Sequence, residues 1–304
     1  MPIRSLTCGN TTWMNVEKPT FQDVERLRLI FHFHPLALED VLSRNERPKI
    51  DEYEDTLFLV LQFPDFREEQ QLSFPCELHV FLGPNYLVTA HDAPLRPVVD
   101  LFRECEQDEA ARRRNMEAGP GWLLYRILDR MVDHLFATLD RVGVRIRRLE
   151  EGLFTQDVRL IVEEISLVRR DLIALRSIVK PQLGPITDLE QKDHPLIRQD
   201  LRPYFGDIAD GFHKAWDTLE DYREIMDDLS ETADSLTSYR INEVMRVLTV
   251  ISVIMLPLTV LAGIYGMNVP LPLAHSPVSF ILILGLMVLI AAGMLSYFRR
   301  RGWL

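Results

Sequence analysis

The clearest feature of the hydrophobic pattern is a pair of uncharged runs, residues 247–265 and 278–298. Both runs consist mostly of Val, Ile, Leu and Met, and about 20 such residues in a helix cross the hydrocarbon core of a bilayer. A single run of this kind could be a buried helix of a soluble protein. Two consecutive runs, separated only by residues 266–277, favour two membrane-spanning helices instead.

Short apolar segments rich in β-forming residues predict a small sheet earlier in the chain. They cover residues 56–63, 77–83 and 85–91, with turn-forming residues between them. Residues 34–43 have a proline near their start, which predicts a helix beside this sheet. We therefore expect an α/β head over residues 1–115.

After the head, the apolar residues recur at helical spacing and no longer in short strand-like segments. Residues 122–154 and 157–183 predict two helices that pack as an antiparallel pair. Residues 183–203 contain three prolines and predict a connector, so that 116–203 form the helical pair and its connector. One helical pattern then continues as a stalk over residues 204–246 into the first span.

Positive charge flanks the two spans on one side only. Arg240 and Arg246 precede the first span and three arginines lie in the tail, residues 299–304, whereas residues 266–277 contain no Asp, Glu, Lys or Arg. Because basic residues stay on the cytoplasmic side, we expect a multi-pass protein of the inner (plasma) membrane with both termini in the cytoplasm. Two spans cannot enclose a conduction path, so a channel built from this chain would be a homo-oligomer.

The expected stalk and first span share one polar stripe. Its members recur in steps of four and three, a repeat typical of several helices packed about an axis. The stripe is acidic in the stalk and mostly small or polar in the span, which favours an electronegative vestibule, including Glu224 and Glu231, that leads into a pore. The stripe consists of Asp217, Asp221, Glu224, Asp228, Glu231, Ser235, Ser238, Asn242, Met245, Thr249, Ser252, Leu256, Thr259 and Gly263.

Both halves of the stripe also have a simpler interpretation. An acidic helix face is often only solvated, and small or hydroxyl residues such as Thr249, Ser252 and Thr259 also hold membrane helices together. On the pattern alone, pore lining and helix packing fit these three residues equally well. Continuity with the acidic stalk favours the pore.

Composition narrows the functional classes. The net charge of −11 opposes nucleic-acid binding and is compatible with attracting cations, although acidity more often serves solubility. Cys8, Cys76 and Cys105 are odd in number and widely spaced, so reduced thiols are expected. Residues 1–13 lack the apolar region of a secretory signal. We find no P-loop, HExxH motif or nucleophile elbow, so an enzyme is the least supported class and no organic cofactor is expected.

The first span ends in Tyr-Gly-Met-Asn, residues 265–268, and this ending resembles the CorA family of magnesium channels. Residues 240–268, 297–304, 34–61 and 85–91 are also similar to that family, so the resemblance covers nearly the whole chain. It implies a funnel-shaped homopentamer with an α/β head and long stalk helices continuous with the pore-lining first spans. It also implies uptake of Mg²⁺ as substrate, with Co²⁺ and Ni²⁺ as further candidate ions, driven by the membrane potential.

The resemblance assigns the external mouth of the pore to Gly266, Met267 and Asn268. The Asn268 amide would hydrogen-bond the water shell of the ion, because Mg²⁺ gives up its water reluctantly. The apolar members of the pore face would form a hydrophobic constriction. Together, the stripe and the resemblance give a pore face of Asn242, Met245, Leu248, Thr249, Ser252, Leu256 and Thr259.

The resemblance further implies that cytosolic Mg²⁺ is a regulatory ligand, held by carboxylates between neighbouring heads. The matching positions are Glu39, Asp40 and Asp207. Carboxylates that crowd across an interface repel one another until a cation bridges them, so loss of Mg²⁺ would loosen the ring and favour opening. Residues 144–151, VRIRRLEE, are basic where acidic family members carry further carboxylates, which predicts fewer or weaker regulatory ions.

The external loop departs from the family pattern, in which glutamates follow Gly-Met-Asn. Residues 269–277, VPLPLAHSP, contain no acid and one histidine, His275, which could contact a softer ion such as Zn²⁺ or simply be solvated. The alternative function is therefore a ZntB-like zinc transporter of the same superfamily, which could be coupled to protons. A different class of hypothesis is a membrane-tethered sensor or scaffold that conducts nothing.

Overall fold

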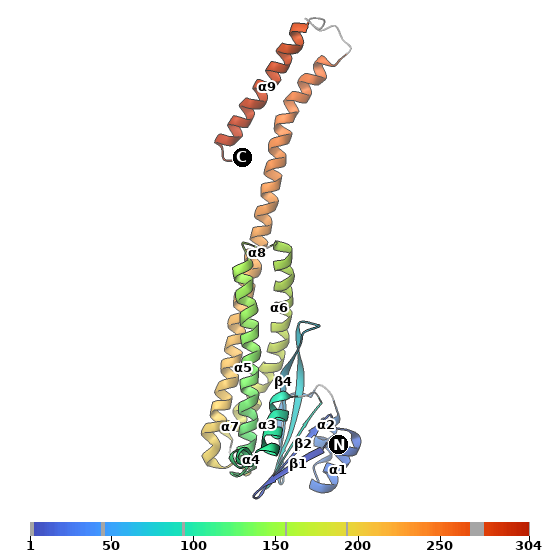
Figure 1. Ribbon diagram of the computed structural model, residues 1–304, viewed down its shortest axis with the longest axis vertical. Helices are drawn as coiled ribbons and strands as arrows, with labels where there is room; N and C mark the ends of the chain where they lie inside the picture. The colour runs from blue at the N-terminus through green and yellow to red at the C-terminus, as the bar shows by residue number, and fades with distance from the viewer. Residues whose placement is uncertain are drawn as a thin grey trace. The chain divides into compact units, whose positions relative to one another are not determined.

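The computed structural model describes residues 3–43, 46–92, 95–155, 157–192, 194–267 and 277–303. It divides into two compact units, Met1–Ser230 and Glu231–Leu304. The first unit contains the sheet and most of the helices, and the second contains the end of one long helix and the final helix (Figure 1).

The first unit is built on one mixed sheet of six strands. The strand order is β1-β2-β6-β5-β4-β3, in which β2 and β6 run parallel and the other neighbours antiparallel. The three predicted strand segments are confirmed as parts of β4, β5 and β6, and β4 and β5 extend beyond them as a long hairpin. The strands are β1 (Ile3–Cys8), β2 (Thr11–Glu17), β3 (Lys49–Tyr53), β4 (Thr56–Arg67), β5 (Leu72–Leu82) and β6 (Tyr86–His91).

Helices surround this sheet and continue beyond it. They are α1 (Phe21–Phe31), α2 (Pro35–Leu42), α3 (Arg96–Gln107), α4 (Glu109–Met116), α5 (Pro120–Gly152), α6 (Val158–Val179), α7 (Leu183–Gln191), α8 (Arg202–Tyr265) and α9 (Pro277–Arg300), with 3₁₀ turns η1 (Lys180–Gln182) and η2 (Gln199–Leu201). The predicted helix at 34–43 is confirmed as α2. It begins at Pro35, where a missing N–H breaks no intrahelical bond, and the His34 ring accepts a hydrogen bond from the Leu36 N–H at 3.3 Å.

The predicted antiparallel helical pair is confirmed as α5 and α6, which lie side by side (Figure 1). The expected connector at 183–203 contains a helix, α7, that the prediction lacked. Pro185 lies in the first turn of α7, and Pro203 is the second residue of α8. Proline is tolerated in a first turn, because the N–H groups there have no intrahelical partner. Two of the three prolines thus mark helix starts.

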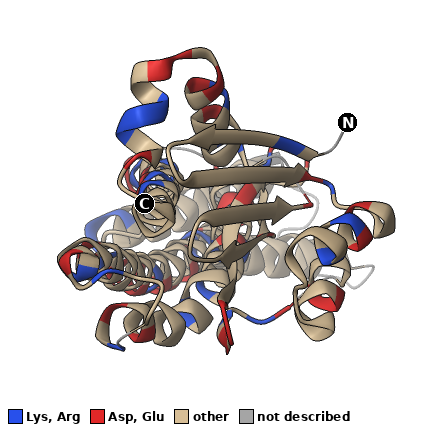
Figure 2. Ribbon diagram, turned by 90° about the horizontal axis from the view of Figure 1, so that it is seen from below, with Lys and Arg blue, Asp and Glu red and all other residues tan. Residues whose placement is uncertain are grey.

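Helices cover both faces of the sheet, which explains why its central strands are continuous apolar runs. α1 and α2 pack on one face, where Phe58, Val60 and Phe81 belong to the same buried cluster. α5 and α6 contact the sheet from the other face, where the rings of Phe63 and Phe212 lie 6.1 Å apart. In Figure 2 most of the strand surface is uncharged, and Lys, Arg, Asp and Glu are concentrated on the helices.

The second unit contains the C-terminal part of α8 and all of α9. Both helices are long and apolar enough to cross a membrane, in agreement with the predicted spans. Their large apolar side chains are mostly exposed, as in Leu256 at 67% and Leu289 at 70%. Such a surface requires lipid or other protein chains around it. An α/β unit, a long helix and a C-terminal helix therefore confirm the predicted fold class.

Candidate cation pathway

The polar stripe of α8 is exposed along its whole length. All fourteen members, from Asp217 in the first unit to Gly263 in the second, are exposed in the single chain. In the first unit α8 instead buries Leu219, Met226 and Leu229. Neither unit therefore uses the stripe for packing against another described segment of the chain.

In the second unit, α8 meets α9 on a different side. Val250 is buried, and Ile254 and Leu258 on the same side are half-buried. The Arg246 guanidinium donates a hydrogen bond to the Gly302 carbonyl, just beyond α9, at 3.4 Å. At about 100° per residue, the expected pore face lies roughly half a turn away from this contact side.

The hydroxyl groups of the stripe within the first span are held by their own helix. Thr249, Ser252 and Thr259 each donate to the backbone carbonyl four residues earlier, at 2.7, 2.9 and 2.9 Å. A hydroxyl has one hydrogen and two lone pairs, so each oxygen keeps its acceptor capacity. These groups can therefore accept hydrogen bonds from water around a cation. The other expected pore residues, Asn242 and the apolar Met245, Leu248 and Leu256, are also exposed.

The two acids of the expected vestibule differ from their neighbours on α8. Glu224 and Glu231 are exposed and form no ion pair with another described residue. Off the stripe, Arg223 pairs with Glu220 at 3.3 Å and with Asp227 at 2.9 Å. The negative charge of Glu224 and Glu231 is therefore not neutralised by a neighbouring base.

At the expected mouth, the structure describes Gly266 and Met267. The Gly266 N–H donates to the Ala262 carbonyl at 2.9 Å, and a Cβ on Gly266 would lie 3.1 Å from that oxygen. Met267 follows with 57% of its surface exposed. Asn268 and His275 lie outside the described residues, so the expectations for both stay predictions.

Two of the expected regulatory residues lie on α2. Glu39 is exposed, whereas Asp40 forms an ion pair with Lys49 of β3 at 2.7 Å, and Lys49 also contacts Asp51 at 3.0 Å. Burial lowers the pKa of Lys49, but the hydrogen bonds with Asp40 and Asp51 outweigh it and raise the pKa well above its usual value. The Asp40 charge is thus compensated within its own chain, which the sequence pattern did not indicate.

The third expected regulatory residue, Asp207, lies exposed on α8 near two carboxylates of α5. Partial burial raises the pKa of Asp129, Arg126 at 3.1 Å lowers it, and the charges of Asp133 and Asp207 raise it further. Asp129 and Asp133 were not among the predicted residues. Their spacing of one helical turn is visible in the sequence, but the approach of α8 is not.

Glu39, Asp40 and Asp207 do not form a metal centre within one chain. The part of the chain that the structure describes contains no group of three or more His, Cys, Asp or Glu side chains able to hold a metal ion. A regulatory ion at these positions would therefore need ligands from a second copy.

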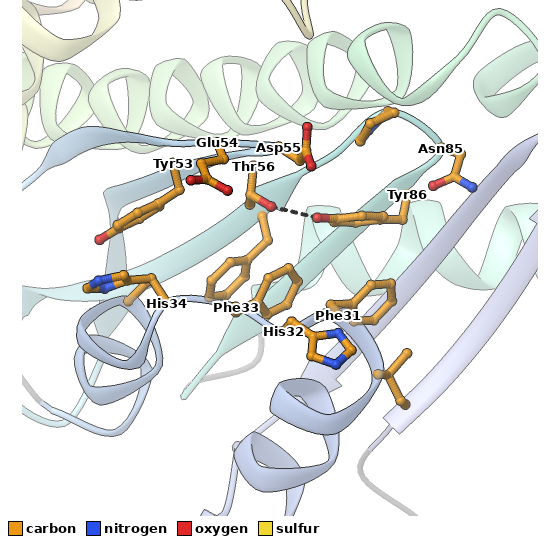
Figure 3. Close-up of a pocket in the computed structure, with 14 residues that line it drawn as sticks. Phe31, His32, Phe33, His34, Tyr53, Glu54, Asp55, Thr56, Asn85 and Tyr86 are labelled. Atoms are coloured by element: carbon orange, nitrogen blue, oxygen red, sulfur yellow. Dashed lines mark hydrogen bonds between the residues drawn. The ribbon is translucent and has the colours of Figure 1, made fainter.

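A cavity of about 740 Å³ lies elsewhere in the first unit, between the α1–α2 link and the turns before β4 and β6. None of the predicted site residues lines it. Figure 3 shows its aromatic wall and the hydrogen bond between the hydroxyls of Thr56 and Tyr86, at 2.6 Å. The rings belong to Phe31, His32, Phe33, His34, Tyr53, Phe81 and Tyr86. Two acids, Glu54 and Asp55, are exposed at the β3–β4 turn.

An α/β unit, two candidate membrane helices and an exposed polar stripe on the first of them define a two-span membrane transport protein. Residues 9–300 match the family model described as CorA-like Mg²⁺ transporter protein. The chain belongs to this family, as Tyr-Gly-Met-Asn indicated.

Individual relatives agree with this assignment. The cobalt/magnesium transport protein CorA of Thermotoga maritima is 32% identical over 306 residues, which cover 100% of this chain and 86% of the relative. The structure of the CorA magnesium transporter from Methanocaldococcus jannaschii, 25% identical, matches with a TM-score of 0.85 over 99% of this chain and 94% of that one. The zinc transport protein ZntB of Pectobacterium carotovorum is 20% identical, over 85% of this chain and 77% of the relative.

Proposed function

We propose that the protein is a homopentameric channel for Mg²⁺ uptake, with Co²⁺ and Ni²⁺ as further substrates, driven by the membrane potential. The observation that carries this proposal is the exposed stripe of α8 on the side away from α9. A polar face on a membrane helix needs water or polar partners. Copies of α8 arranged about an axis would supply both, and would make a funnel-shaped assembly with the stripes inside.

The chemistry of the stripe suits a hydrated divalent ion. Mg²⁺ gives up its water reluctantly, and that water points its hydrogen atoms outwards, so a wall of acceptors can guide the ion without stripping it. The hydroxyl oxygens of Thr249, Ser252 and Thr259 retain this acceptor capacity. Asn268 at the external mouth would contribute amide oxygens, and Glu224 and Glu231 would attract cations to the vestibule.

The membrane potential is sufficient as the driving force. Each elementary charge gains about 2.3 kcal/mol per 100 mV, so a divalent ion gains about twice as much and needs no coupled ATP hydrolysis. Uptake into the cytoplasm requires a multi-pass inner-membrane protein with both termini in the cytoplasm, as the arginines beside the spans favour. The apolar Met245, Leu248 and Leu256 would close the pore by dewetting.

Cytosolic Mg²⁺ would regulate the channel at the interface between heads, where Glu39, Asp40 and Asp207 of neighbouring copies would share ions. The ion pair between Asp40 and Lys49 bears on this regulation. A Mg²⁺ ion at Asp40 would compete with a lysine that stays protonated throughout the physiological pH range. Lys49→Met should therefore lower the Mg²⁺ concentration that inhibits flux, whereas an unchanged concentration would argue against Asp40 as a ligand.

The proposal is tested by flux into liposomes that contain the purified full chain, at a potential fixed with K⁺ and valinomycin. Mg²⁺ should enter without ATP or a pH gradient, and Asn268→Ala should reduce its entry. Asn85→Ala is the matched control, because this exposed asparagine of the first unit lies outside the proposed pathway. Equal flux in the two variants would mean that Asn268 does not form the mouth. Absence of flux in both variants and in the unchanged chain would favour a non-conducting scaffold.

Zinc transport is the second candidate, favoured by the external loop without acids and by the similarity to ZntB. The same liposomes distinguish the two functions when Zn²⁺ replaces Mg²⁺ with and without a pH gradient. Entry of Zn²⁺ only with a proton gradient, together with no entry of Mg²⁺, would overturn the magnesium proposal.

A further inference from the structure

A second cavity, of about 520 Å³, lies in the first unit where the β4–β5 hairpin meets α5 and α6. Three arginines of α5, Arg141, Arg145 and Arg148, contribute to its wall. Their spacing of four and three residues places them on one face of the helix. They belong to the basic segment RVGVRIRR in a chain whose net charge is −11. This part of the cavity wall is therefore positively charged in a molecule that is negatively charged as a whole.

Two of these arginines are held in place by the cavity wall and still have unused donors. The Arg141 guanidinium lies 3.8 Å over the ring of Phe66, and its Nε and Nη2 atoms are buried without a hydrogen-bond partner among the described residues. Arg145 donates Nε and Nη2 to Glu164 at 3.0 and 2.8 Å, which leaves Nη1 buried without a described partner. Buried guanidinium donors are rarely left unpaired.

The third arginine differs from the other two in its exposure and its contacts. Arg148 is exposed and forms no ion pair with a described residue. It can therefore bind a ligand at the rim of the cavity without breaking an existing contact.

Nearby acids compensate only part of this positive charge. Burial lowers the pKa of Arg141 and so does Arg145, whereas Asp171 and Glu68 raise it. The Asp171 carboxylate is fully buried and accepts a hydrogen bond from the Ser73 N–H at 2.6 Å. Glu68 and Glu164 are the acids in the cavity wall, so three arginines face two carboxylates there.

Apart from Gln71, the remaining wall is apolar. Leu149 and Ile161 are buried at 3% exposure, and Leu160 is 60% exposed at α6. A ligand that contacts both parts of the wall would need an anionic group and an apolar or aromatic group. A cavity of this size accommodates a molecule as large as a nucleotide.

We propose that this cavity binds a phosphate-bearing anion through Arg141, Arg145 and Arg148, with the apolar wall receiving the rest of the molecule. Arginine suits this role because its planar fork of donors matches phosphate oxygens. The source of the phosphate group is a soluble nucleotide or the headgroup of an anionic lipid. Such binding is independent of the cation pathway, since no residue of the expected pore face lines the cavity.

The test uses the full chain, purified in detergent, with EDTA present so that no Mg²⁺ links the ligand to carboxylates. Binding of ATP, inorganic phosphate and monomeric dihexanoyl-phosphatidylglycerol is measured by calorimetry at low and high salt. Arg148→Gln should weaken binding about tenfold or more, and high salt should weaken it further. Arg147→Gln, one residue away and outside the cavity wall, is the matched control and should change affinity less than about twofold.

Each outcome of this test decides the proposal. Binding of ATP that is lost in Arg148→Gln supports a nucleotide, and binding only of the short lipid with the same loss supports a headgroup. Absence of binding by all three probes overturns the proposal, and so does an equal effect of Arg147→Gln and Arg148→Gln. Because Arg148 is exposed and has no ion-pair partner among the described residues, its variant should fold, which circular dichroism and gel filtration verify.

Discussion

In the first unit Phe58, Phe63 and Phe81 are fully buried, whereas in the second Phe280 and Ile281 have 70% of their surface exposed. Both units are rich in the same residue types, so hydrophobicity alone does not separate them. The first unit covers its apolar side chains with its own sheet and helices. The described part of the second unit consists of two helices, and most of their circumference has no partner among the described residues.

This difference shows where each unit obtains its stability. Burial by the chain itself stabilises the first unit, at roughly 25 cal/mol per Å² of apolar surface. The second unit depends on lipid and, in the proposed channel, on further copies. Substitutions of one residue type should therefore have different consequences in the two units.

The largest effect is expected for Phe81→Ala. Removal of a fully buried ring leaves a cavity and should lower the free energy of unfolding by about 3–5 kcal/mol. Phe280→Ala, at a position 70% exposed, should lower it by much less. Chemical denaturation of both variants in detergent measures the difference, and equal losses would contradict the comparison.

An added positive charge should affect the second unit more than the first, which is the opposite of the order expected for the removal of a ring. Leu289→Arg places a cation in the middle of α9 and should cost about 3 kcal/mol of membrane insertion. Leu29→Arg on α1, at 71% exposure against 70% for Leu289, is the matched control and should insert normally. Membrane fractionation after expression compares them. Normal insertion of Leu289→Arg would mean that α9 is not in contact with lipid there.

Acid should act outside the two spans, because residues 247–265 and 278–298 contain no His, Asp, Glu, Lys or Arg. Burial lowers the pKa of His79 from 6.5 to about 4, and this outweighs the Ala90 backbone and the charges of Asp40, Asp92 and Glu46, which raise the pKa. Between these two values the unfolded chain binds more protons, so stability falls as the pH decreases from about 6.5 to about 4.

The total loss from this histidine is at most of order 3 kcal/mol. Denaturation at several pH values measures the slope, and His79→Leu should make it shallower. An unchanged slope in that variant would assign the pH dependence to other groups.

The smallest effect is expected within the spans. Ser252→Ala removes one acceptor from the proposed pore face, and a neutral hydrogen bond contributes about 0.5–1.5 kcal/mol. Mg²⁺ flux should therefore decrease several-fold. Ser296→Ala, at an exposed serine of α9, should leave flux unchanged. A larger effect of Ser296→Ala would indicate that α9, and not α8, lines the pathway.

Local features of the fold were accessible from the sequence. The spans, the pair α5 and α6 and the exposed stripe of α8 depend on spacing within one helix, which the chain displays directly. β1, β2 and β3 lie outside the predicted segments, because polar residues such as Thr, Asn, Asp and Glu interrupt their apolar positions. Pairing with stronger strands, and not local propensity, makes them part of the sheet.

The expected sites depend on contacts between distant segments, and these were less accessible. Neither the ion pair of Asp40 with Lys49 nor the approach of Asp207 to Asp129 follows from spacing. Each requires knowing which elements pack together. The basic segment of α5 was visible in the sequence, but the cavity it lines requires the β4–β5 hairpin and α6.

The orientation of the stripe hydroxyls has a consequence for chloride. An anion can leave water only where N–H or O–H groups point towards it. Thr249, Ser252 and Thr259 direct their hydrogens back to their own helix and present only lone pairs. In the proposed pore these three residues would repel anions and favour cations without a single fixed negative charge in the span.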